Sequence, residues 1–130
     1  MPLTAQTRNL IFEKIKSVLQ KQSPPMVMSK NSANCFELIG NKPVAYGSKK
    51  QLVPGMYFSS VVARKNMISF YFFPMYYHLD DFKDLIPTMI KTLKGKTCFN
   101  IKKTEQINEK ELSALLKKGV QAWKNNGYMQ

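Results

Sequence analysis

The sequence has few of the residues that catalysis and metal binding most often use. Its 130 residues include one histidine and two cysteines, and only eight acidic residues stand against 20 lysines and arginines. It contains no Gly-x-Ser-x-Gly segment, no phosphate-binding glycine loop and no dinucleotide-binding motif. A catalytic nucleophile needs a base and an orienting acid close by, and no pattern in the sequence indicates such a set. We therefore expect a protein that is not an enzyme and that needs no cofactor.

Long hydrophobic runs are also lacking. The longest apolar run, 67–77, is interrupted by a serine and a proline and is too short to cross a bilayer as a helix. Near the N-terminus, the apolar residues 10–12 are followed at once by Glu13, which is not typical of a secretory signal. Cys35 and Cys98 lie far apart in the sequence, each in an apolar, strand-like segment, and this context predicts buried free thiols. These features predict a soluble, cytoplasmic protein without membrane insertion.

The excess of basic residues indicates the class of partner. The net charge is +12 and the isoelectric point is about 9.8, which favours contact with phosphate-rich or otherwise anionic partners. The basic residues are spread along the chain rather than gathered in one block, and such a distribution is also typical of a generally basic domain.

The stretch 56–77 predicts the centre of a sheet. Two runs of β-branched and aromatic residues flank a turn formed by Lys65 and Asn66, and Asn66 is a residue able to take a positive φ. This turn fixes the register of the hairpin, with Ala63 facing Ile68, Val61 facing Phe70 and Ser59 facing Phe72. We expect the apolar face of this hairpin to be fully buried under helices: Val61, Ala63, Ile68, Phe70 and Phe72.

Helical periodicity appears in three further segments. Apolar residues recur at helical spacing over 4–22, over 82–93 with an interruption at Pro87, and over 109–126, where Asn108 and Glu111 have the spacing of a capping box. The apolar stripes are Ile11, Phe12, Ile15, Val18 and Leu19 in the first helix, and Leu112, Leu115, Leu116, Val120 and Trp123 in the last. Residues 1–130 thus predict a single α+β domain. We expect a two-layer sandwich, with an antiparallel sheet of about five strands and the N-terminal, middle and C-terminal helices packed on one face.

The second face of the hairpin is the predicted binding site. It mixes aromatic, hydroxyl and basic side chains, and the candidate ligand-binding residues are Phe58, Ser60, Arg64, Lys65, Ser69, Tyr71 and Phe73. We expect an anionic or amphipathic ligand or partner. Single-stranded nucleic acid is an alternative, because aromatic and basic residues alternate here, and a homodimer interface is another.

One cluster has the residue types of a metal site. His78, Asp80, Asp81 and Asp84 offer an imidazole and three carboxylates, which together are suited to iron or zinc. The same acids are also typical of the first turn of a helix, where they stabilise its free N–H groups.

The C-terminal half resembles a known family. The run Leu93–Lys103, LKGKTCFNIKK, is followed by a helix ending LLKKGVQAW, and both resemble the YdhG-like family of small bacterial domains, most of unknown function. The hairpin and its Pro74-Met75-Tyr76 exit are similar too, so the likeness runs from about residue 57 to the C-terminus. The resemblance implies an antiparallel sheet with terminal helices packed on it. Because some members are described as frataxin-like intracellular iron chaperones, it also implies iron binding as an alternative function.

Overall fold

The computed structural model describes residues 4–23, 25–46, 49–77 and 79–129, and it is an α+β fold. A six-stranded antiparallel sheet has the strand order β1-β2-β5-β6-β8-β7, and β3 and β4 form a separate two-stranded sheet. The strands are β1 (Val27–Asn31), β2 (Cys35–Ile39), β3 (Val44–Tyr46), β4 (Gln51–Val53), β5 (Tyr57–Ala63), β6 (Ile68–Phe72), β7 (Leu93–Lys94) and β8 (Cys98–Ile101). The α-helices are α1 (Ala5–Gln20), α2 (Pro74–Tyr77), α3 (Leu79–Phe82) and α4 (Glu109–Asn125), and the 3-10 turns are η1 (Lys83–Leu85), η2 (Met89–Thr92) and η3 (Thr104–Gln106).

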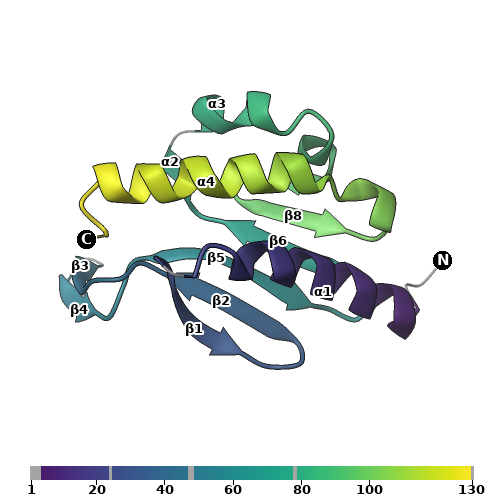
Figure 1. Cartoon of the computed structure of the whole chain (residues 1–130), viewed down its shortest axis with the longest axis horizontal. Coiled ribbons are helices and arrows are strands. Elements are labelled where there is room, and N and C mark those ends of the chain that lie inside the picture. Colours follow the sequence, from purple (N-terminus) through teal and green to yellow (C-terminus); the bar gives the residue numbers. More distant parts are fainter. Residues whose placement is uncertain (1–3, 24, 47–48, 78, 130) are drawn as a thin grey trace.

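The two long helices form one layer against the sheet. Figure 1 shows α1 and α4 running side by side on one side of it, and α1 contacts both β5 and β6. Every residue of the two predicted apolar stripes is buried. The helix starts also agree with the sequence, since Thr4 Oγ1 accepts a hydrogen bond from Thr7 N at 3.1 Å and Asn108 Oδ1 accepts one from Glu111 N at 3.1 Å.

The central hairpin has the predicted register. Ala63 pairs with Ile68, Val61 with Phe70 and Ser59 with Phe72. Val61, Ile68, Phe70 and Phe72 are fully buried, whereas Ala63 near the hairpin end is only half-buried. Asn66 does not take a positive φ, because the loop has four residues and is closed by a 2.8 Å hydrogen bond from Arg64 N to Met67 O. Among the described non-glycine residues, only Lys50 has a positive φ.

A β-bulge moves Phe58 to the helix side of the sheet. Leu38 pairs with Ser59 but Ile39 pairs with Tyr57, so β5 has one extra residue opposite β2. The Phe58 side chain is 0% exposed, and its ring centroid lies 5.8 Å from that of Trp123 on α4. The prediction that Phe58 lies on the second face is therefore wrong, and Tyr57 takes that position instead.

The segment around Pro87 is held by a side chain from α4. The predicted interruption is present, and the segment consists of short turns rather than one helix: α3, η1 and η2. Glu111 is largely buried, and its Oε1 accepts hydrogen bonds from Thr88 N and Met89 N, each at 2.9 Å. Its carboxylate therefore caps η2 rather than closing a capping box at the start of α4.

Candidate functional site

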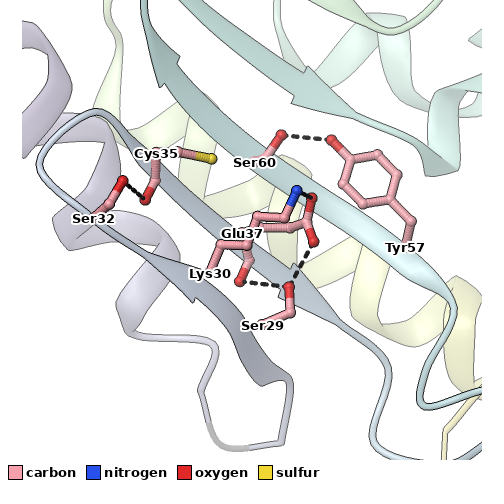
Figure 2. Close-up of polar contacts among 7 residues, drawn as sticks. All are labelled: Ser29, Lys30, Ser32, Cys35, Glu37, Tyr57 and Ser60. Carbon is pink, nitrogen blue, oxygen red and sulfur yellow. Dashed lines mark hydrogen bonds and ion pairs between the residues drawn. The ribbon is translucent and has the colours of Figure 1, made fainter.

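The candidate site is the face of the sheet opposite α1 and α4, which we call the open face. In Figure 2 this face is turned to the viewer and the long helices lie behind the sheet. The pairing of the six strands aligns one row of residues across it, from edge to edge: Lys30, Glu37, Ser60, Tyr71, Cys98 and Lys94. A second row, two residues along the strands, consists of Cys35, Val62, Ser69 and Asn100. The open face is therefore a mostly polar surface built by strand register.

Arg64 directly follows β5 and is held in place over this surface. Its Nη2 donates to Tyr71 Oη at 2.6 Å and its Nε donates to Ser69 Oγ at 3.4 Å. Ser69 Oγ in turn donates to Asn100 Oδ1 at 3.3 Å. Arg64 has no ion-pair partner among the described residues. Its positive charge is held in position by neutral groups and is not neutralised.

Next to Asn100, at the β7 end, lies a cavity of about 220 Å³ that we call the basic cavity. Its wall includes Lys91, Lys94, Lys102 and Asn100, and none of the described residues that line it is acidic. These lysines are exposed and form no ion pair within the described part of the chain. With Arg64 two hydrogen bonds away, this end of the open face concentrates positive charge.

The β1–β2 end of the open face carries an acidic side chain, Glu37. Glu37 Oε2 accepts a hydrogen bond from Ser29 Oγ at 2.6 Å, and Glu37 Oε1 lies 4.0 Å from Lys30 Nζ (Figure 2). Here a cavity of about 390 Å³, which we call the Glu37 cavity, lies between the sheet and residues 53–56. Its other wall residues include Ile39, Val53 and Tyr57.

Tyr57 is part of both the open face and the Glu37 cavity. Its hydroxyl group shares a 2.6 Å hydrogen bond with Ser60 Oγ, which Figure 2 shows, and its ring lies 5.8 Å from that of Phe73. Burial of the side chain raises the pKa of the Tyr57 phenol well above its usual value. The neutral phenol is therefore the form that the folded protein favours.

The structure brings most of the predicted ligand-binding residues together. Ser60, Arg64, Ser69 and Tyr71 lie on the open face, with Ser60 and Ser69 only 4% and 3% exposed. The remaining predicted residues lie elsewhere. Phe58 is in the core, Lys65 is at the hairpin tip, where its carbonyl accepts a 3.4 Å hydrogen bond from Arg8, and Phe73 packs at the sheet end between the rings of Tyr57 and Trp123.

Asp80, Asp81 and Asp84, the predicted metal ligands that the structure describes, do not form a metal site by themselves. Asp80 lies 3.2 Å from Lys83 Nζ in an ion pair, and no group of three or more potential ligand side chains occurs among the described residues. His78 lies outside the described residues. In the same described ranges, no helix is both long enough and apolar enough to cross a membrane.

Sequence reasoning missed several residues of this face, and four of them are instructive. Glu37, Lys94, Asn100 and Lys102 were not among the predicted site residues, although Asn100 and Lys102 alternate with buried Phe99 and Ile101. This alternation of buried and exposed residues in a strand would have placed Asn100 and Lys102 on the face opposite the core. Glu37 and Lys94 required the pairing of β2 with β5 and of β7 with β8, which is not visible in any single segment.

Comparison with known proteins gave no match to a family model, to a curated protein or to a solved structure.

Proposed function

We propose that this protein is a non-enzymatic, cytoplasmic binding domain that binds a phosphate-bearing anion at the basic end of its open face. The observation that carries the proposal is the position of Arg64, whose guanidinium is oriented by Tyr71 and Ser69 and has no carboxylate partner among the described residues. An arginine held in place loses little conformational freedom when it binds an anion, so more of the interaction energy remains as affinity.

The residues around Arg64 fit a phosphate-bearing ligand. The lysines of the basic cavity supply charge, and the Asn100 side chain supplies a neutral polar group between them and Arg64. Several separate positive charges suit a ligand whose negative charge is spread over several oxygens, as in phosphate esters and diphosphates. Both cysteines are free thiols, which agrees with a reducing compartment such as the cytoplasm.

The test is a calorimetric titration with inorganic pyrophosphate at low and at physiological salt. We expect binding that weakens as salt rises, because exposed charges are screened. Arg64→Gln and Lys102→Gln should each weaken it about tenfold, since a hydrogen bond to a charged group contributes roughly 1.5–3 kcal/mol.

Lys117→Gln is the matched control. Lys117 is exposed on α4, in the helix layer, so this substitution removes the same charge from the other side of the molecule. We expect it to leave pyrophosphate affinity nearly unchanged. If it weakened binding as much as Lys102→Gln, the attraction would come from the overall charge and the proposed site would be wrong.

Single-stranded nucleic acid is a second candidate, favoured by the position of the Tyr71 ring beside Arg64 in the middle of the open face. Bases stack on such rings, and each stacked base contributes about 1–3 kcal/mol. Fluorescence anisotropy with a labelled oligonucleotide separates the two candidates. Tyr71→Phe keeps the ring and Tyr71→Leu removes it, while both variants free the Arg64 guanidinium. A greater loss of oligonucleotide binding in Tyr71→Leu than in Tyr71→Phe would therefore indicate stacking. Equal effects of the two variants would indicate that only the backbone phosphates are bound.

A further inference from the structure

We propose that the Glu37 cavity is a second binding site, selective for a small amphipathic amine in its protonated form. The cavity measures about 390 Å³, which is within the usual range for small-ligand sites. In this geometry the ammonium group of the ligand binds the Glu37 carboxylate, and its hydrocarbon part lies against Ile39, Val53 and Met56. The proposal does not depend on the anion site, because no lysine of the basic cavity and no atom of Arg64 lines the Glu37 cavity.

Charge complementarity identifies the head group of the ligand. Glu37 is the only charged side chain among the described residues that line this cavity, in a protein whose net charge is +12. Its side chain is only 20% exposed, so a buried ligand charge beside it is screened less than at the surface. A carboxylate accepts hydrogen bonds and cannot donate them, so an ammonium group is favoured over a neutral or anionic one.

The existing partner of Glu37 is easily replaced. Lys30 Nζ lies 4.0 Å from Glu37 Oε1, beyond hydrogen-bond distance, and the Lys30 side chain is 65% exposed. Exposed ion pairs of this kind contribute little to stability. A ligand ammonium inside the cavity can approach the same oxygen closely, while Ser29 continues to bind the other oxygen. The ring of Tyr57 offers a further favourable surface to a cation.

The apolar wall of the cavity is attached to the sheet by backbone contacts. Gly40 N donates to Met56 O at 2.8 Å, which ties residues 53–56 to the end of β2. Gly55 is buried against the Gly40 carbonyl so closely that no β-carbon would fit between them. These contacts attach the wall to the sheet close to Ile39, so a ligand has less of the chain to order when it binds.

The proposal is tested with three probes of similar size on the whole protein: hexylammonium, hexanol and hexanoate. Methyl signals of Ile39 and Val53 in NMR spectra report binding. We expect hexylammonium to bind about tenfold or more tightly than hexanol, and hexanoate to bind least. Glu37→Gln should remove the difference between hexylammonium and hexanol. Lys30→Gln should tighten hexylammonium binding, because it removes the competing ammonium and leaves Glu37 intact.

Two control variants separate this site from general charge effects. Glu109, like Glu37, forms an ion pair with a lysine, since Lys14 Nζ lies 3.8 Å from its carboxylate, but Glu109 does not line the cavity. The Glu109→Gln substitution should therefore not change the affinity for hexylammonium. Arg64→Gln should leave it unchanged too, which distinguishes failure here from failure of the anion site. Equal binding of hexylammonium and hexanol, a preference for hexanoate, or no shift at Ile39 and Val53 would each overturn the proposal.

Discussion

Replacing Gly119 by alanine should destabilise the protein, although helix propensity alone predicts the opposite. Gly119 is buried in the middle of α4, where a glycine costs about 1 kcal/mol relative to alanine. A β-carbon added there would lie 2.5 Å and 2.8 Å from two ring atoms of Phe72 and 3.0 Å from the Phe58 ring. Since the Phe72 ring is also in edge contact with Phe58 and with Phe82, it has little room to move away.

The overpacking outweighs the gain in helix propensity. Forcing an extra methyl group into a packed core costs about 1–3 kcal/mol, and the several close contacts at Gly119 place the cost near the upper end. We therefore expect the free energy of unfolding, measured by urea denaturation, to fall by about 1–2 kcal/mol. In a Phe72→Leu background the same substitution should be neutral or stabilising, because the ring atoms are gone. A Gly119→Ala protein as stable as the parent would refute this account of the helix–sheet contact.

Three further predictions concern single side chains. Glu111→Ala should lower the free energy of unfolding by about 3 kcal/mol in urea denaturation, because two backbone N–H groups at the start of η2 lose a charged acceptor; a loss below about 1 kcal/mol would contradict this role. The raised pKa of Tyr57 means that the folded protein holds the phenol proton more tightly than the unfolded chain does. Stability from this group is thus complete below about pH 10 and falls as pH rises above it. The Tyr57→Phe variant should lose less stability than the parent between about pH 9 and 11 in the same assay, and identical losses would count against the burial of this phenol. Tyr71→Phe should weaken pyrophosphate binding severalfold, because the Arg64 guanidinium loses the hydrogen bond that orients it, while the free energy of unfolding should change by less than about 1 kcal/mol. Unchanged affinity would mean that the orientation of Arg64 does not matter.

The sequence predicted best what depends on local periodicity. The turn at Lys65 and Asn66, flanked by alternating apolar residues, gave the correct hairpin register, and the helical spacing of apolar residues identified both buried stripes. A one-residue slip would have moved every core residue of the hairpin to the wrong face, so this pattern is strongly constrained. The α+β class follows from the same signals, with six strands in the main sheet rather than about five.

What the sequence did not predict depends on contacts between distant segments. The side on which Phe58 lies is decided by the bulge against β2, and the carboxylate of Glu111 binds backbone N–H groups more than 20 residues away. Likewise, Glu37 and Lys94 enter the same row only because four strand pairings align them. No window of sequence contains these relations, because each involves segments that meet only in the folded chain.

The residues at the two ends of that row also determine how the sheet meets other molecules. Lys30 is on edge strand β1, where a second bulge interrupts the ladder, and Lys94 is on edge strand β7, which has only two residues. A strand from another copy that paired with either edge would place its own chain against a lysine and an irregular or very short ladder. The sheet is thereby protected against growth by strand addition, which lets an open polar face exist without promoting aggregation.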